Sequence, residues 1–118
     1  MRDPAKLKAF HLADDLALHM YKATATFPRH EQFGLTTQMR KAAVSIPSNI
    51  VEGCGRDTQG DYVHFLDISY ASACELQYQV SLAHRLGYLK KAPHDTLQSK
   101  CTETCKVLNA LIRSLRQG

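Results

Sequence analysis

Apolar residues recur every three or four positions through four stretches of this 118-residue chain, and only short polar links separate the stretches. That spacing gathers the apolar side chains on one face of an α-helix. A helix with one apolar face must bury that face against other helices, and short links make consecutive helices antiparallel neighbours. The sequence therefore predicts an all-α fold, an antiparallel up-down four-helix bundle in which residues 1–118 form a single domain.

The first helix is bounded by proline and small polar residues. It is predicted to begin at Pro4, with Asp3 as its N-cap. It is predicted to end at Thr26, because the residue before a proline avoids the helical conformation and the chain continues with Phe27-Pro28. In the polar link that follows, Phe33 is expected to anchor in the core.

The second helix contains a proline. It is predicted to begin at Thr36 or Thr37, both fair N-caps, and to be closed by Gly53 and Gly55. Pro47 has no N–H to donate, and its ring clashes with the carbonyl four residues earlier, which costs about 3 kcal/mol in a helix interior. The helix must therefore kink or break, and the small residues before the proline favour a kink.

The third helix has the clearest limits. Thr58 and Asp61 form a T-x-x-D capping pattern at its start, and Gly87 is a typical stop after its end. The fourth helix is predicted from Pro93 to Leu115. Its apolar positions alternate by four and three residues, as in a coiled-coil seam. That predicted seam consists of Leu97, Cys101, Cys105, Leu108, Ile112 and Leu115.

The bulk properties argue against a membrane span and leave a nucleic-acid partner open. The net charge is +4 and the isoelectric point about 9.0, a mild excess that fits nucleic acid or an acidic protein without requiring either. No run of about 18 apolar residues exists, and the amino-terminal residues lack the apolar core of a signal peptide. We therefore expect a cytoplasmic protein with reduced cysteines.

The cysteines and histidines give little support for catalysis or metal binding. Cys101 and Cys105 form an i,i+4 pair that could hold a metal ion with Cys54, Cys74 or a histidine. Both lie in the predicted seam, where a thiol packs as a small apolar group, and we favour that interpretation. The six histidines form no H-x₃-H pair. Without a nucleophile–base pair or a phosphate loop, we expect no metal, no cofactor and no enzymatic activity.

Asn49, Glu52 and Glu75 admit two interpretations. Asn49 and Glu52 share a face if the second helix continues past its proline, and Glu75 adjoins an apolar position of the third helix. A buried carboxylate needs a cation or hydrogen-bond donors. The possible cationic partners are Arg40, Lys41 and Arg85. The three residues either fix helix register or a subunit interface, which we favour, or act as general acid and base.

Basic residues accompany the fourth helix. Lys106, Arg113 and Arg116 fall on one broad side of it, and Lys90 and Lys91 lie in the turn before it. Such side chains can contact phosphates without reading a base sequence. A solvated helix face is the alternative interpretation.

One long pattern resembles a known bacterial family. The matching segments are Leu35–Gly53, Phe65-Leu66, Glu75-Leu76 and Leu86–Leu89, and the most specific piece is Gln38–Ile50 followed by Glu52-Gly53. The chain is similar to the four-helix bundle family first noted as proteins encoded by intervening sequences inserted in 23S ribosomal RNA genes. One departure is Tyr70-Ala71-Ser72, where alanine stands in place of the usual glycine and can alter a close helix approach.

The resemblance implies an antiparallel four-helix bundle that assembles as a ring-like homo-oligomer, a pentamer. The same fold group includes accessory proteins of diversity-generating retroelements, which pair with a reverse transcriptase and bind nucleic acid through basic surfaces. No enzymatic activity is implied. The resemblance assigns fold or assembly roles to Arg40, Ser45, Pro47, Asn49, Glu52 and Glu75.

Three hypotheses for function follow. The first is a non-enzymatic oligomeric bundle that binds structured RNA or DNA, or a nucleic-acid-processing protein, through its basic faces. The second is a protein-interaction scaffold with no affinity for nucleic acid. The third, and least favoured, is a hydrolase that depends on a metal or on paired carboxylates.

Overall fold

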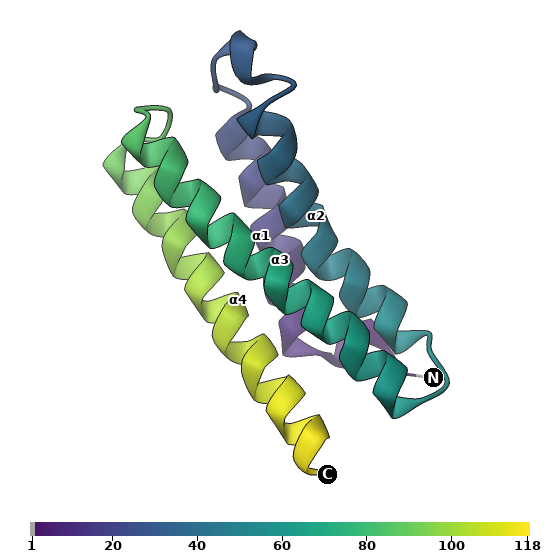
Figure 1. Cartoon of the computed structure of the whole chain (residues 1–118). Coiled ribbons are helices and arrows are strands. Elements are labelled where there is room, and N and C mark those ends of the chain that lie inside the picture. The colour runs from purple at the N-terminus through teal and green to yellow at the C-terminus, as the bar shows by residue number, and fades with distance from the viewer. Residues whose placement is uncertain (1) are drawn as a thin grey trace.

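Four long helices make up the computed structural model, which describes residues 2–118 (Figure 1). The helices are α1 (Lys8–Thr24), α2 (Leu35–Cys54), α3 (Gln59–Arg85) and α4 (Lys91–Gln117). Two short 3₁₀ turns, η1 (Pro4–Lys6) and η2 (Arg29–Glu31), precede α1 and α2. No strand occurs among the described residues, so the predicted all-α class with four helices is confirmed.

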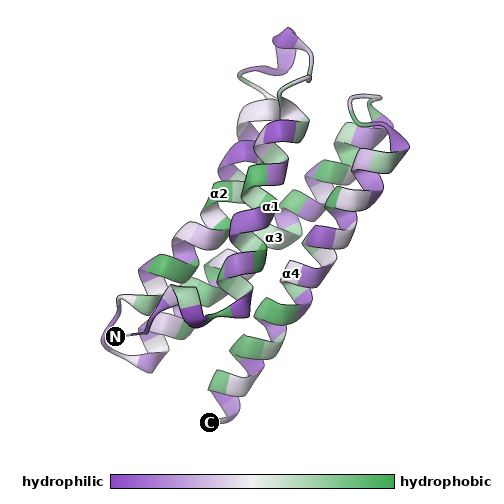
Figure 2. Ribbon diagram, turned by 180° about the vertical axis from the view of Figure 1, so that it is seen from behind, coloured by the Kyte–Doolittle hydropathy of each residue, from purple (hydrophilic) through white to green (hydrophobic). Residues whose placement is uncertain are grey.

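Each long helix packs against two others. α2 lies between α1 and α3, α4 packs against α3 and α1, and the diagonal pairs do not meet. The result is an elongated body of 44 × 23 × 19 Å. Hydrophobic and hydrophilic residues alternate along each long helix (Figure 2), and most of the buried residues are hydrophobic. The largest side chains that are fully buried include Leu16, Met20, Met39, Ile46, Ile50, Leu66, Leu76 and Leu108. All four helices therefore share one hydrophobic core.

The start of α1 differs from the prediction. Asp3 does act as a cap, since its carboxylate accepts a hydrogen bond from the Ala5 N–H at 3.0 Å, but the structure that it caps is η1. Leu7 then adopts an extended conformation, with φ −103° and ψ 122°, and separates η1 from α1. A helix continuous from Pro4 was therefore a wrong prediction.

The link between α1 and α2 also departs from expectation. Phe33 is 89% exposed, so the predicted core anchor is wrong; Phe27 is buried at this end of the bundle instead. α2 begins at Leu35 without a cap from its threonines. The Glu31 carboxylate accepts the Leu35 N–H at 3.0 Å, and it replaces Thr36 and Thr37, the predicted N-caps. α2 runs unbroken from Leu35 to Cys54, which excludes a break at its proline.

The predicted limits of α3 are confirmed at both ends. The Thr58 hydroxyl accepts a hydrogen bond from the Asp61 N–H at 3.1 Å. At the other end Gly87 has φ +84°, a conformation that side-chain-bearing residues rarely adopt. This bend lets the Tyr88 N–H reach the Ala83 carbonyl at 2.9 Å, as in a Schellman motif.

α4 begins two residues earlier and ends two residues later than predicted. Pro93 lies in its first turn, where the missing N–H has no intrahelical partner to lose. The buried positions of α4 are Leu97, Cys101, Thr104, Leu108 and Ile112. Cys105 and Leu115 are partly buried and pack against the same core, so the predicted seam is confirmed, with Thr104 as a buried position that the prediction did not include. Thr104 can occupy the core because its hydroxyl donates to the Lys100 carbonyl at 2.8 Å.

Gly53 allows α2 to approach α3 closely. A Cβ at this position would lie 3.0 Å from the Phe65 Cβ and 3.1 Å from the Tyr62 carbonyl oxygen. Contacts this short to backbone and to a Cβ cannot be relieved by rotating a flexible side chain. The absence of a side chain at Gly53 therefore sets the helix–helix distance at this end of the bundle.

We expect Gly53→Ala to destabilise the protein by about 1–3 kcal/mol, because the added methyl overpacks a rigid contact. The matched control is Gly60→Ala in the first turn of α3, where a Cβ meets nothing within 4 Å. The control should be neutral or stabilise by up to about 1 kcal/mol, since alanine favours helix over glycine. Urea unfolding of both variants measures the difference. Equal stability of the two variants would contradict the close approach.

Candidate functional site

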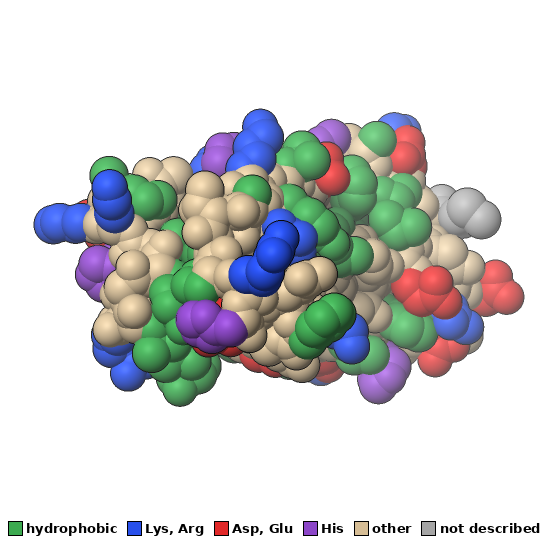
Figure 3. Space-filling model, turned by 90° about the horizontal axis from the view of Figure 1, so that it is seen from above, with side chains coloured by type: hydrophobic (Ala, Val, Ile, Leu, Met, Phe, Trp, Pro, Cys, Tyr) green, Lys and Arg blue, Asp and Glu red, His purple; other side chains and the backbone are tan. Residues whose placement is uncertain are grey.

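The five basic residues predicted to contact phosphates do not gather into one patch. Lys90 and Lys91 lie at the start of α4, whereas Lys106, Arg113 and Arg116 lie along its second half. At 1.5 Å per residue, Lys91 and Arg116 are separated by about 38 Å along the helix axis. Lysine and arginine side chains are likewise scattered among apolar and polar ones in the view from above (Figure 3). They fall into two groups, one at the start and one in the second half of α4, which we refer to together as the basic strip.

Carboxylates neutralise part of this strip. Lys91 Nζ lies 2.9 Å from Asp95 Oδ2, and Arg116 pairs with Asp67. The hydrogen bond from Lys91 lowers the pKa of the Asp95 carboxyl, so the pair is ionised at neutral pH. The other three strip residues, Lys90, Lys106 and Arg113, are exposed, and no ion pair joins them to a carboxylate within residues 2–118. Their charge remains available to a partner.

Hydroxyl groups around Pro47 join α2 to α3. The buried Ser69 Oγ donates to the Ile46 carbonyl at 2.8 Å, and Ser45 Oγ lies 2.8 Å from Ser72 Oγ. Asn49 Nδ2 donates to the Ser45 carbonyl at 2.8 Å and to its Oγ at 2.9 Å. The Ser69–Ile46 and Ser45–Ser72 bonds cross from α3 to α2 and fix the register of the two helices, while the Asn49 bonds lie within α2 and hold the Ser45 side chain.

The carboxylates do not form a cluster with Arg40. Glu52 pairs at 2.6 Å with Arg56, two residues beyond the end of α2, and both side chains are about half exposed. Glu75 is exposed and accepts a hydrogen bond from Gln79 Nε2 at 3.2 Å. Glu75 is therefore not a buried carboxylate, and it does not pair with Arg40, one of the three cationic partners considered from the sequence. An exposed i,i+4 pair of this kind contributes about 0.3–0.5 kcal/mol.

Arg40 turns instead toward the end of α1. Its Nε donates to Thr24 Oγ1 at 2.8 Å, and an Nη donates to the Tyr21 carbonyl at 3.3 Å. The guanidinium also lies 4.7 Å from the centre of the Tyr21 ring, a cation–π distance. Thr24 Oγ1 in turn donates to the Met20 carbonyl at 2.8 Å. Three contacts therefore fix the orientation of the guanidinium.

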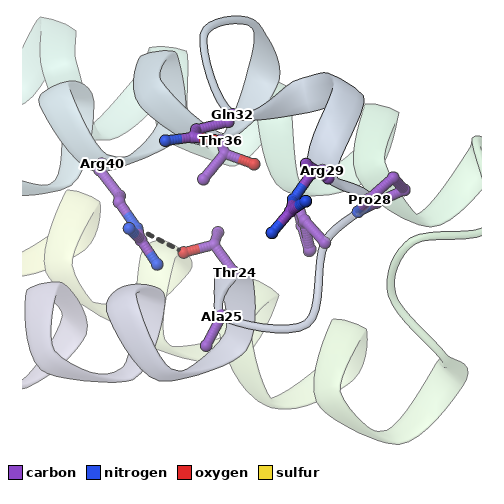
Figure 4. Close-up of a pocket in the computed structure, with 8 residues that line it drawn as sticks. Thr24, Ala25, Pro28, Arg29, Gln32, Thr36 and Arg40 are labelled. Carbon is purple, nitrogen blue, oxygen red and sulfur yellow. Dashed lines mark hydrogen bonds between the residues drawn. The ribbon is translucent and has the colours of Figure 1, made fainter.

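Beside Arg40 lies a pocket of about 310 Å³ between the end of α1 and the start of α2 (Figure 4). It is lined by Thr24, Ala25, Phe27, Pro28, Arg29, Gln32, Thr36 and Arg40. Analysis of the sequence missed this site. Its residues come from two helices and the link between them, and they follow no motif, so no local pattern could have indicated it.

The Glu31 carboxylate, next to this pocket, is hydrogen-bonded to residues that do not line it. Its carboxylate accepts the Leu35 N–H at 3.0 Å and the Tyr88 O–H at 2.8 Å. The Leu35 N–H, and then the Tyr88 hydroxyl, lower the pKa of Glu31 below its ordinary value. The ionised side chain therefore ties the α1–α2 link to the residues that follow α3.

Three of the four cysteines, Cys54, Cys101 and Cys105, pack in or against the hydrophobic core, and Cys74 is exposed. Burial raises the pKa of Cys101 to about 12, and burial with the neighbouring Cys74 raises the pKa of Cys105 to about 11. Among residues 2–118, no three histidine, cysteine or acidic side chains are grouped to hold a metal ion. His84 and His94 stack with ring centres 4.3 Å apart.

Across the described chain, no helix combines the length and apolar character that membrane crossing requires.

The thiols should differ sharply in reactivity, because the thiolate is the reactive form. At mildly alkaline pH we expect an alkylating reagent to modify the exposed Cys74 in the folded protein. Cys101 and Cys54, both buried, should react only after denaturant is added. Peptide mass spectrometry measures each site. Fast modification of Cys101 in the folded protein would contradict its place in the core.

Residues 5–110 match the sequence model of a family described as 23S rRNA-intervening sequence protein. Among solved structures, the chain is similar to a protein of unknown function from the S23 ribosomal protein family of Bacteroides thetaiotaomicron VPI-5482, with a TM-score of 0.82. The two sequences are 21% identical over 89% of this chain and 95% of the other. That likeness establishes a shared fold. No curated protein matches this chain significantly.

Proposed function

Because the chain belongs to the 23S rRNA-intervening sequence protein family, we propose that it is a non-enzymatic helical bundle that binds structured nucleic acid in the cytoplasm. The observation that carries the proposal is the set of exposed cations on α4 without carboxylate partners: Lys90, Lys106 and Arg113. The family's name associates its members with an insert in ribosomal RNA, and this association supports RNA as the ligand.

The length of the basic strip favours a duplex stem. A separation of about 38 Å corresponds to about 11 base pairs of B-form DNA at 3.4 Å per step, and to a few more base pairs of an A-form RNA stem, which rises less per step. Scattered lysine and arginine contacts to phosphates position a protein on a stem, but they carry no base-sequence information. Binding of this kind recognises the shape and charge of the nucleic acid.

Removing two of these cations should weaken binding and reduce its salt dependence. We expect the double variant Lys106→Gln/Arg113→Gln to bind a labelled RNA hairpin less tightly at low salt. The slope of log K against log salt should fall by about 1 for each phosphate that the variant no longer neutralises. The control, Lys8→Gln/Lys22→Gln, removes the same charge from exposed positions of α1. Equal binding by the two double variants would contradict a role for α4.

The alternative function is a protein-interaction scaffold with no affinity for nucleic acid. Its support is the number of large apolar side chains on the surface. Those at least 36% exposed are Leu18, Tyr21, Phe33, Val44, Val51, Ile68, Tyr78 and Leu86. Absence of binding to both an RNA hairpin and a DNA duplex at low salt would favour this alternative.

We also propose that the chain forms a homo-oligomer, the pentamer that the family resemblance implies. Two apolar side chains of α3, Ile68 and Tyr78, are exposed at seam-like spacing, with Glu75 between them in sequence, and Tyr78 is 59% exposed. Apolar side chains at this spacing are typical of helices that pack against a partner helix. The stripe gives Glu75 a place in the proposed interface.

Light scattering should give a mass near five times the 13.2 kDa chain mass. Tyr78→Lys should lower that mass, because it places a charge in the proposed interface. Thr102→Lys, on the exposed side of α4, is the control. Glu52→Ala should also lower the mass if Glu52 has its proposed assembly role, since within the chain it makes only a surface pair. A monomer mass for the unaltered protein contradicts assembly.

We also propose that neighbouring helices are antiparallel and that α2 bends at Pro47. Only residues 55–58 separate α2 from α3 and residues 86–90 separate α3 from α4, and such short links favour antiparallel neighbours. In α2, Pro47 cannot donate to the Ala43 carbonyl. We therefore expect a bend at Pro47 within the continuous helix, supported from α3 by the Ser69–Ile46 hydrogen bond.

Pro47→Ala tests the bend. Alanine restores the missing N–H and relieves the ring clash, so the variant should stay folded and be no less helical by circular dichroism. The neighbouring Ser48→Pro, at an exposed position, should lose about 3 kcal/mol of stability and shows that the assay detects a disruptive proline. Loss of helicity in Pro47→Ala would contradict this account, because it would mean that α2 needs the proline in order to fold.

A further inference from the structure

We propose that the pocket lined by Thr24, Arg29, Gln32, Thr36 and Arg40, the α1–α2 pocket, binds a phosphate group. The phosphate is either inorganic phosphate or the terminal phosphate of a nucleic-acid strand. The proposal does not depend on the basic strip of α4, because none of the strip residues lines this pocket.

Thr36 is the first indication of a ligand. The residue is only 8% exposed, and its Oγ1 has no hydrogen-bond partner within residues 2–118. A buried polar group without a partner costs about 1–3 kcal/mol, so such groups are rare without a reason. Thr36 lies between the two arginines, with its hydroxyl oxygen on the side of Arg29 (Figure 4). An oxygen of a bound phosphate would accept the Thr36 O–H.

Arg40 offers donors that are already oriented. A guanidinium has five N–H groups, and two of them are used by the Thr24 hydroxyl and the Tyr21 carbonyl. The other three have no acceptor among the described residues. The Tyr21 ring further restricts the guanidinium plane. Because these contacts hold the Arg40 guanidinium in place before a ligand arrives, the side chain loses little entropy when it binds an oxyanion.

Arg29 provides a second cation across the pocket. Its side chain is exposed and makes no ion pair within the described chain, and Figure 4 shows its guanidinium directed back toward Thr24. The lining contains no acidic side chain. Glu31, the nearest acidic residue in sequence, accepts from Leu35 and Tyr88 instead. No carboxylate pairs with Arg29 or Arg40 within residues 2–118, and the two guanidiniums outnumber the single charge of the neighbouring Glu31, so the pocket keeps a net positive charge.

The arrangement fits phosphate better than carboxylate. A carboxylate is planar, and its two oxygens can satisfy one guanidinium in a bidentate pair. Here two guanidiniums and a hydroxyl present donors from different directions, which suits the oxygens of a tetrahedral phosphate. Thr36 also lies in the first turn of the 20-residue helix α2, where the helix dipole favours an anion.

Titration with inorganic phosphate, followed by ¹⁵N NMR at constant ionic strength, tests the site. We expect saturable shifts of the Thr36 amide and of the Arg40 Nε–H. Thr36→Val should bind about tenfold more weakly, because one hydrogen bond to a charged group is removed, and should be no less stable than the unaltered protein. Arg29→Gln, at an exposed position, should weaken binding by a similar factor. Arg113→Gln, on α4, is the control and should bind as the unaltered protein does.

Two results would overturn the proposal. One is the absence of saturable shifts at Thr36 and Arg40 up to high phosphate concentration. The other is equal phosphate affinity of Thr36→Val and the unaltered protein, which would mean that only diffuse charge attracts the anion. Failure here leaves the α4 proposal intact, because Lys106→Gln/Arg113→Gln should alter hairpin binding and leave phosphate binding unchanged.

A second arm identifies the source of the phosphate. A short single-stranded RNA is compared with and without a 5′-phosphate, against the unaltered protein and Thr36→Val. Tighter binding of the phosphorylated strand, abolished in Thr36→Val, supports the strand end as the ligand. Equal binding of the two strands, with inorganic phosphate still bound at Thr36 and Arg40, supports free phosphate.

Discussion

The packing of α2 against α3 is the interaction on which the rest of the structure depends. Gly53 lacks the side chain that would hold the helices apart, and about two turns earlier on α2 the Ile46 carbonyl accepts a hydrogen bond from buried Ser69. The first contact sets the distance between the helices and the second sets their register. With both fixed, the opposite side of α2 can receive α1, and α3 can receive α4 on its free side.

The packing of α2 against α3 also keeps the basic strip of α4 apart from the α1–α2 pocket. Since α2 is held against α3, Arg40 points to the end of α1 and is held by Thr24 and Tyr21. α4 touches α3 and α1 along one side only, which leaves Lys106 and Arg113 in solvent. The proposed nucleic-acid strip and the α1–α2 pocket are therefore distinct consequences of one packing arrangement, and substitutions can alter each separately.

The sequence predicted what depends on local patterns. Helical periodicity gave the four helices, and the Thr58 cap and the Gly87 stop were placed correctly because each depends on residues a few positions away. Tertiary contacts decided what was missed. Phe33 points outward because Phe27 is buried at that end of the core, and Arg40 meets Thr24 rather than Glu75. The α1–α2 pocket combines residues that share no spacing, so only the folded chain brings them together.

The central claim is that α4 presents a nucleic-acid-binding surface, and lysine acetylation footprinting of the protein with a labelled RNA hairpin tests it most directly. Acetylation of each lysine, measured by peptide mass spectrometry with and without RNA, reports which side chains the ligand covers. We predict protection of Lys90 and Lys106, with Lys8 and Lys22 on α1 modified equally in both samples. Protection confined to Lys8 and Lys22, or no protection at low salt, would contradict the claim.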